Sequence, residues 1–504
     1  MWQDFRPKEI ARDLRGLGEA GVEWIRAFLL WPDFMPSRET VDRAMISRLR
    51  AFLDLVEDSG LRLQLVLLVG HMSGENWTPP WLPDPSRLYE DPELLWAQEL
   101  YVGTIVEVAR GAPCLDAYGL TNEIDRLAGP APSNVVSPWA DRLYRLVKGL
   151  DPSRPVLLGD GAWYVLGEDS GFSPGTPQDV IAPHLYLSDE DPERLVAGHA
   201  LAVATAKALA GGREVWLEEF GAAHSVFGEE QIAEWAGRVV EEARLAGAER
   251  ICWWCGLDFT TAGERPYVHH AFELSFGLLR ADRSQRPVAH ALRRAMDRPV
   301  PDLPEAGLLV PSHFLRRYPF VAADDRDLTT RTLRNAYAAL RRLGYRVRVV
   351  LEEQVAPDTT PSPLVVPSTR KLLAPTWSAL EGLPGEVLYS YLHGGSFFQG
   401  AWISGARSFF GGEPRNRYAV PEPPPARLVA GEEAWDLPAA EDPFVGTPLL
   451  IDPREAEVLG TDESGRPLWL RVGRRNLLLY PLEAVAPTPE AVAAVYRRML
   501  RPAT

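Results

Sequence analysis

Short apolar runs alternate with amphipathic helical stretches through the first 300 residues of the chain. Each run has about four to eight residues of strand-type composition and is apolar on both faces, as parallel strands covered by helices are. Two of the helical stretches, 43–60 and 231–247, end in glycine, a common residue just beyond a helix. This order predicts a parallel α/β fold with right-handed crossovers. The apolar runs are VEWIRAFLL, LRLQLVLLVG, LDAYGLTNE, PVLLGDG, VIAPHLYL, REVWLEEFG and ERICWWCGLDF.

The runs number seven, which is one fewer than the strands of a (β/α)8 TIM barrel. Residues from about Pro7 read as a helix, so we expect the first strand to lie upstream of Met1. The pattern therefore predicts a (β/α)8 TIM barrel over residues 1–300 that lacks its first strand and is incomplete at its N-terminal edge.

The pattern changes after Pro299, where PVPDLP reads as a linker. Residues 301–430 contain shorter strand and helix signals, such as GLLVPS, YRVRVVLEE and PLVVPS, and predict a flavodoxin-like α/β domain. The segment PEPPPARL is a proline-rich surface segment. Residues 431–504 predict a small β domain, because DESGRP and VGRR are turn sequences between apolar runs.

Composition excludes several classes of partner. The chain has 504 residues and a net charge of −16, which disfavours binding to nucleic acid or to an anionic membrane surface. No apolar run reaches the roughly 18 residues of a membrane span, and the charged start MWQDFRPKEIARD is not a secretory signal. We therefore expect a cytoplasmic protein.

Three cysteines, Cys114, Cys252 and Cys255, are too few for a disulfide framework. Cys252 and Cys255 form one C-x-x-C, but a zinc ribbon needs a second pair. We interpret both as small apolar residues of a buried strand, and we expect no metal and no cofactor.

Active sites of α/β barrels lie at the carboxyl ends of the strands, so the residues at those ends are the candidates for chemistry. They are polar, aromatic and rich in carboxylates, although the strands themselves are apolar, and burying such groups is costly unless pairing or function compensates. The residues are Arg26, His71, Asn122, Glu123, Asp160, His184, Tyr186, Glu219 and Trp254.

Two carboxylates from different strands are what cleavage of a glycosidic bond requires. We interpret Glu123 as the general acid/base and Glu219 as the nucleophile, with carboxyl groups about 5 to 5.5 Å apart, the spacing of retaining enzymes. Glu218 is the alternative nucleophile; strand alternation should place only one of the two inside, and the E-F-G context favours Glu219. Taken singly, an N-E or an E-F-G sequence is more often a structural cap than a catalytic motif; both together, on the fourth and seventh strand positions, favour catalysis.

The neighbouring polar residues have candidate roles in the same reaction. Asn122 could bind the hydroxyl beside the anomeric carbon, Tyr186 could donate a hydrogen bond to Glu219, and Arg26 could keep Glu219 charged. His71 and His184 are either substrate ligands or satisfied core histidines. The H-x-Y sequence at a strand end, beside the carboxylates, favours the ligand role, so both are predicted to bind substrate.

Four tryptophans follow predicted strands, where a sugar ring could stack on them. They are Trp77 and Trp81 in HMSGENWTPPWLP, Trp163 in DGAWY, and Trp254 in CWWCG. The alternative is that they fill the core. Stacking is favoured for Trp254, whereas Trp81 and Trp163 fit both interpretations about equally.

These residues together resemble glycoside hydrolase family 5, whose clan has its catalytic glutamates on strands four and seven. WIRAFLLWPDFMP, with Arg26, resembles the second strand of that family. GHMSGENWTPPWLP and HHAFELSFGLLRADRSQRPVAHAL resemble its bacterial β-mannosidase-type branch. The C-terminal part is similar in layout to the trimerisation domain of family 42 β-galactosidases.

The resemblance implies a retaining exo-β-mannosidase acting on oligosaccharides or glycosides, a homo-oligomer (a trimer) and no metal. It implies the same roles for Glu123 and Glu219 and carries over Arg26, Asn122, His184, Tyr186 and Trp254. Alternatives are a β-galactosidase, a β-glucosidase, an endo-β-mannanase or a non-catalytic sugar-binding protein. HGGSFFQGAW resembles an amidotransferase segment, but residues 301–504 contain no cysteine to serve that chemistry.

Overall fold

The computed structural model describes residues 1–316, 324–369, 371–393, 403–415 and 422–500. The chain forms two compact units. The first unit comprises Met1–Tyr186 and Leu209–Val300, and the second comprises Leu187–Ala208 and Pro301–Thr504. The second unit thus also takes residues 187–208 from within the range that the sequence pattern gives to the barrel.

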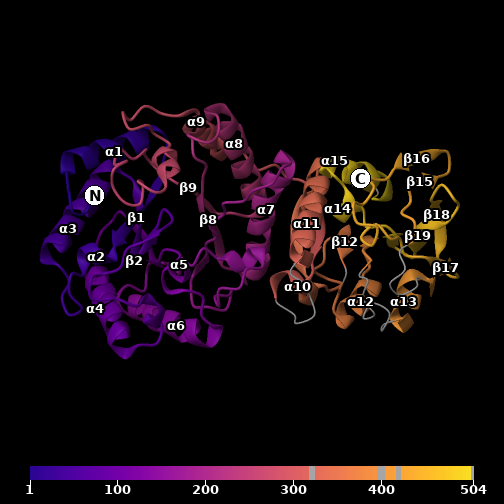
Figure 1. Cartoon of the computed structure of the whole chain (residues 1–504), viewed down its shortest axis with the longest axis horizontal. Coiled ribbons are helices and arrows are strands. Elements are labelled where there is room, and N and C mark those ends of the chain that lie inside the picture. The colour runs from indigo at the N-terminus through magenta and orange to yellow at the C-terminus, as the bar shows by residue number, and fades with distance from the viewer. Residues whose placement is uncertain (317–323, 370, 394–402, 416–421, 501–504) are drawn as a thin grey trace. The chain divides into compact units, whose positions relative to one another are not determined.

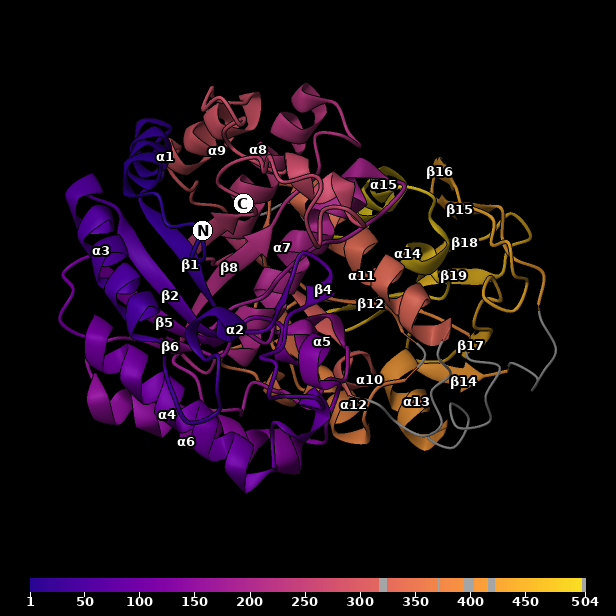
Figure 2. The same cartoon turned by 60° about the vertical axis from the view of Figure 1, so that its left-hand side comes forward.

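The first unit is built around a seven-stranded parallel sheet that curves into a nearly closed barrel (Figures 1 and 2). Among the described residues, no strand lies between its first strand β1 and its last strand β9, so the predicted TIM barrel with one strand fewer than eight is confirmed. The strands in order are β1 (Trp24–Leu30), β2 (Arg62–Val69), β5 (Leu115–Thr121), β6 (Val156–Leu157), β7 (Val180–Ile181), β8 (Glu214–Phe220) and β9 (Arg250–Trp253).

Helices cover the outside of this sheet, and Figure 2 shows α3, α4 and α6 outside strands β1, β2 and β5. In α3, Asp42 accepts hydrogen bonds from two backbone N–H groups at the start of the helix, and Gly60 ends it with a left-handed φ of 75°. The helices are α1 (Pro7–Glu19), α2 (Trp31–Phe34), α3 (Arg43–Ser59), α4 (Pro92–Ala109), α5 (Ile124–Ala128), α6 (Ser133–Leu150), α8 (Glu229–Ala246) and α9 (Pro287–Asp297).

Short elements occupy the loops of the first unit. They are β3 (His71–Met72), β4 (Glu75–Asn76), η1 (Pro85–Arg87), η2 (Trp163–Leu166) and η3 (Ala271–Ser275). The strands β3 and β4 pair as a small hairpin directly after β2. These loop elements follow the carboxyl ends of strands and supply side chains around the candidate site.

A flavodoxin-like sheet forms the second unit, as the sequence predicts. Its parallel part has the order β11-β10-β12-β13-β20, which corresponds to strand order 2-1-3-4-5. The fifth strand, β20, comes from residues that the sequence pattern assigns to the separate small β domain. The strands are β10 (Glu305–Val310), β11 (Arg346–Leu351), β12 (Leu364–Thr369), β13 (Val387–Tyr391) and β20 (Arg475–Leu478).

The same sheet continues through β19, β18, β15 and β16, which are antiparallel. The hairpin with its turn at VGRR joins β19 to β20, so it links the antiparallel strands to the parallel ones. Residues 301–430 and 431–504 therefore share one sheet. The remaining strands are β14 (Gly412–Pro414), β15 (Arg427–Ala430), β16 (Glu433–Asp436), β17 (Ile451–Pro453), β18 (Glu457–Thr461) and β19 (Pro467–Val472).

The helices of the second unit are α7 (Pro192–Leu209), α10 (Ser312–Leu315), α11 (Asp324–Arg342), α12 (Ala374–Glu381), α13 (Ile403–Phe410), α14 (Leu482–Val485) and α15 (Pro489–Met499), with η4 (Glu352–Gln354). In HGGSFFQGAW, only the first residue is described, so the amidotransferase-like segment lies outside the described residues. No helix in the described part of the chain has the length and apolarity to cross a bilayer.

Candidate active site

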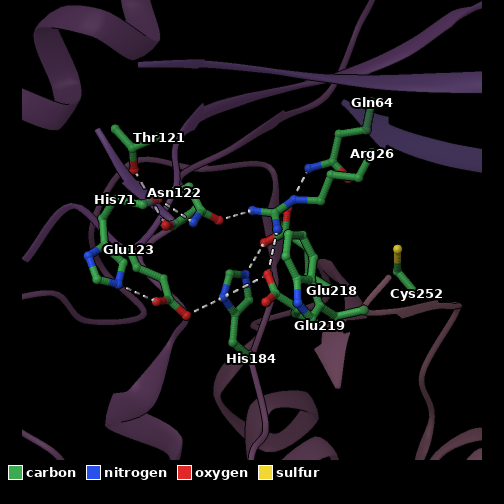
Figure 3. Close-up of polar contacts among 12 residues, drawn as sticks. Arg26, Gln64, His71, Thr121, Asn122, Glu123, His184, Glu218, Glu219 and Cys252 are labelled. Atoms are coloured by element: carbon green, nitrogen blue, oxygen red, sulfur yellow. Dashed lines mark hydrogen bonds and ion pairs between the residues drawn. The ribbon is translucent and has the colours of Figure 1, made fainter. Parts of the chain in front are cut away.

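Polar side chains from five strands converge inside the carboxyl ends of the barrel (Figure 3). Arg26 comes from β1 and Gln64 from β2, whereas Asn122 and Glu123 follow β5 directly. His184 follows β7, and Glu218 and Glu219 lie on β8. The structure thus brings together the residues that the sequence assigns to separate strand ends.

Glu219 is held by donors on both of its carboxylate oxygens. Arg26 Nη1 donates to Oε2 at 2.8 Å, and the hydroxyl of Tyr186 donates to Oε1 at 2.7 Å. His184 Nδ1 lies 3.5 Å from Oε2. These donors fix the orientation of the Glu219 carboxylate, as a nucleophile requires.

Glu123 has a left-handed backbone, with φ 47° and ψ 51°. Its N–H donates to the carbonyl of Gly159 at 2.6 Å. Gly159 is required there, because a Cβ at this position would lie 1.9 Å from the Thr121 carbonyl oxygen. A non-glycine residue in this conformation is strained, and the strain is compensated by neighbours that fix where the side chain points.

The Glu123 carboxylate contacts two histidines. His184 Nδ1 lies 2.8 Å from Oε1, and His71 Nε2 lies 3.6 Å from Oε2. Asn122 is fixed next to it, because its Oδ1 accepts from Arg26 at 2.9 Å and its amide donates to the His71 carbonyl at 2.9 Å. The strand-end residues therefore form one connected network (Figure 3).

Glu218 is fully buried behind the site and connects three of its residues. It forms an ion pair with Arg26 Nε at 3.2 Å, contacts His184 Nε2 at 3.1 Å and accepts a hydrogen bond from Gln64. Burial acts to raise the pKa of Glu218, but Arg26, His184 and Gln64 lower it below the ordinary value. Glu218 is thus an ionised positioning residue rather than an exposed nucleophile.

The expectation that alternation leaves only one of Glu218 and Glu219 inside was wrong. Both contact Arg26 and His184. The physical reason is local: the pairing register of β8 with β9 shifts between Leu217 and Phe220, so the regular pleat ends where the two glutamates lie.

His184 lies between carboxylates and carries a proton. Burial acts to lower its pKa, but the charge of Glu219 and the hydrogen bonds to Glu123 and Glu218 raise it to about 10. Burial also acts to raise the pKa of Glu123, but the hydrogen bond to His184 lowers it below the ordinary value. In the free site the proton therefore lies on His184, within 2.8 Å of the Glu123 carboxylate.

This proton should make stability depend on pH. Because the pKa of His184 rises on folding from 6.5 to about 10, its contribution is fully present below pH 6.5 and is lost as the pH rises to 10. We expect the free energy of unfolding to fall less steeply over this interval in His184→Asn than in the unmodified protein. Urea denaturation at several pH values measures the free energy of unfolding of both proteins. If this free energy changes with pH equally in both, His184 is not the group responsible.

The predicted aromatic platforms have different surroundings. Trp254 is half-buried; its Nε1 donates to Glu273 Oε2 at 3.1 Å and its ring meets the edge of Phe28. Trp77 is also half-buried, on the segment after β4. Trp163 is only 8% exposed and its face is covered by the guanidinium of Arg126, 4.1 Å from the ring centroid. It therefore fits a packing role better than a stacking role.

Trp81 and Asp160 are also engaged with the protein itself. Trp81 donates from Nε1 to the Met35 carbonyl at 2.8 Å and packs edge-on against Trp31. Asp160 is 2% exposed, and burial together with the charge of Asp125 raises its pKa to about 7. Both residues fit structural roles.

The cysteines are free thiols. Burial raises the pKa of Cys252 to about 12, so this thiol is not poised for nucleophilic or redox chemistry. Among the described residues, one His/Asp/Glu group has ligand atoms close enough to bind a metal: Glu123, His184 and Glu219, within 4.8 Å of one another. Arg26 already pairs with this group and supplies the positive charge that a metal would bring.

Sequence reasoning did not identify the roles of Gln64, Glu218 and Glu273. Gln64 had a signal, since it is an amide inside the apolar run LRLQLVLLVG. Glu218 was considered only as a nucleophile. Glu273 lies in the loop after the last strand and had no signal of its own.

Three comparisons with known proteins bear on this site. No family model matches the chain. A segment is 29% identical over 138 residues to the probable mannan endo-1,4-β-mannosidase F of Aspergillus flavus, covering 24% of this chain and 29% of that protein. The match therefore spans less than a third of the curated relative's length.

Solved structures match much more of the chain. The exo-β-1,4-mannosidase Op5Man5 from Opitutaceae bacterium strain TAV5 is 25% identical and covers 99% of this chain and 91% of its own, with a TM-score of 0.78. A GH5_18 protein from Streptomyces cattleya is 24% identical over 70% of this chain and 90% of its own, with a TM-score of 0.61. The chain is a structural relative of glycoside hydrolase family 5.

This family 5 relationship confirms the resemblance that the sequence motifs indicate. The C-terminal part fits as well, because a β-galactosidase from Marinomonas ef1 covers 99% of this chain and 90% of its own with a TM-score of 0.63. That structure is 14% identical, so it bears on the fold alone.

Proposed function

We propose that this family 5 relative is a retaining exo-β-mannosidase that releases mannose from the non-reducing end of β-mannosides. The observation that carries the proposal is the meeting of Glu123 and Glu219, with one oxygen of each within 4.8 Å, in a chain similar over 99% of its length to an exo-β-1,4-mannosidase. Carboxyl groups this close suit direct attack by one of them, whereas inverting enzymes need room for a water between them.

In the first step, Glu219 attacks the anomeric carbon while the bond to the leaving oxygen breaks. Arg26 and Tyr186 orient the attacking carboxylate, whose negative charge is consumed as the ester bond forms. Glu123 delivers a proton to the leaving oxygen. That proton comes from the Glu123–His184 pair, across 2.8 Å, as the bound sugar displaces water.

In the second step, Glu123 acts as a base. It takes a proton from a water that attacks the anomeric carbon, and Glu219 leaves as a carboxylate. Two displacements at the same carbon give net retention. Asn122, fixed by Arg26 and the His71 carbonyl, is placed beside Glu123 and can bind the hydroxyl next to the anomeric carbon.

The choice of mannose rests on the relatives, since two of them are named as mannosidases. The curated relative is an endo-acting enzyme, so an endo-β-mannanase is the second candidate. Exo action is favoured by the match over 99% of the chain to an exo-acting enzyme. We further infer a homo-oligomer, a trimer, and chemistry without a cofactor, on the family resemblance alone.

A panel of substrates tests the proposal. We expect release of nitrophenol from 4-nitrophenyl β-mannoside and of mannose, one unit at a time, from β-1,4-mannooligosaccharides. The first product observed by NMR should be the β-anomer. Cleavage inside longer chains would favour the endo alternative, and a folded protein inactive on β-mannosides, β-glucosides and β-galactosides would contradict a glycosidase.

A further inference from the structure

One acidic residue at the site has no part in the two-step reaction. Glu273 lies on η3, in the loop that follows β9, the last strand of the barrel. Its Oε2 accepts the indole N–H of Trp254 at 3.1 Å. The Trp254 ring meets Phe28 at 5.7 Å between centroids, and the Arg26 guanidinium lies 4.8 Å from the Phe28 ring.

Opposing effects act on the Glu273 carboxylate. Burial raises its pKa and the charge of Glu219 raises it further, whereas the hydrogen bonds of Trp254 and Ser73 and the charge of His270 act to lower it. The buried guanidinium of Arg26 is already paired with Glu218 and Glu219. A half-buried carboxylate next to another carboxylate is costly unless it gains hydrogen bonds.

The loop that carries Glu273 is fixed by the hairpin after β2. Arg265 Nε pairs with Glu75 at 2.9 Å. The imidazole of His270 lies directly over Gly74, close enough that a Cβ there would be 3.4 Å from its Nε2. Two loops from different strands therefore support each other, and Glu273 is placed by this contact.

We propose that Glu273 is a specificity-determining residue that accepts hydrogen bonds from hydroxyl groups of the terminal sugar while that sugar lies on Trp254. The proposal rests on the proposed glycosidase function. A sugar stacked on an indole projects its hydroxyls past the ring edge, and the Glu273 carboxylate lies at that edge. Charged acceptors bind hydroxyls more strongly than neutral ones, so the carboxylate selects by hydroxyl position.

Glu273→Gln tests this role, because glutamine keeps an acceptor for Trp254 but loses the charge. We expect kcat/KM on 4-nitrophenyl β-mannoside to fall about 10- to 100-fold. The same measurement is then made on the 3-deoxy, 4-deoxy and 6-deoxy mannosides. The substrate that lacks the hydroxyl bound by Glu273 should lose much less activity on Glu273→Gln than the other two substrates. Glu264→Gln, an exposed glutamate on the same loop, is the matched control and should change nothing.

The possible outcomes separate the two proposals. In one outcome the unmodified protein is active, and Glu273→Gln is either equally impaired on every deoxy substrate or not impaired at all. This result overturns the role of Glu273 and leaves the proposed function standing. If the protein cleaves β-glucosides or β-galactosides instead, the deoxy derivatives of that sugar test the role of Glu273 in the same way. A folded protein that cleaves no β-glycoside overturns the proposed function and this role with it.

Discussion

Glu219→Ala is expected to lower kcat on β-mannosides by about four orders of magnitude or more, because it removes the group that forms the bond to the anomeric carbon. The partners of Glu219 remain in place, since Arg26 also binds Asn122 and Glu218. Initial rates with 4-nitrophenyl β-mannoside measure the loss.

Azide separates a nucleophile from a structural carboxylate. A small anion can enter the space left by Glu219→Ala and attack from the same face, so azide should restore part of the rate and give the α-mannosyl azide. The exposed residue Glu234 offers a control, and Glu234→Ala should retain full activity. Loss of rate without any azide product would argue against Glu219 as the nucleophile.

Glu123→Gln is expected to have an effect that depends on the leaving group. We expect kcat on mannobiose to fall by about 10³-fold, because its alkoxide leaves poorly without a proton, and much less on a dinitrophenyl mannoside. The dinitrophenyl substrate should then accumulate the glycosyl-enzyme, since hydrolysis of that intermediate also needs the base. A burst of product followed by a slow steady state is the signal.

The pH profile gives an independent readout of Glu123. In the unmodified protein, activity should fall at high pH as the Glu123–His184 pair loses its shared proton. This limb should disappear in Glu123→Gln with the dinitrophenyl substrate. An equal loss on both leaving groups, with the pH limb unchanged, would indicate that Glu123 acts by position rather than by proton transfer.

The barrel was predictable because its strands are apolar on both faces and its helices carry local signals. Gly247 ends α8 as the sequence predicts. The second unit was harder. Its fifth parallel strand, β20, is the second strand of a hairpin, and nothing in a local pattern indicates that this strand also pairs with β13.

The convergence of Glu123 and Glu219 was predictable for a related reason. Carboxyl ends of parallel strands meet at one end of a barrel, so polar residues after different strands can be assigned to one site without knowing their distances. Trp163 shows the limit of that reasoning: it follows a strand, but Arg126 covers its face. The position of a tryptophan after a strand does not tell whether another side chain of the protein covers its ring.

By itself, the sequence determined the order of strands and helices in the barrel, the strand ends that carry polar residues, and the two candidate glutamates on the fourth and seventh strand positions. Those properties follow from local periodicity and from the alternation of strands and helices, which is typical of a parallel α/β barrel. The tertiary structure decided that Glu218 and Glu219 both contact Arg26 and His184, that His184 lies among carboxylates that raise its pKa, and that Glu273 lies at the edge of Trp254. Such facts depend on distances between residues remote in the chain, which packing sets and no local pattern encodes.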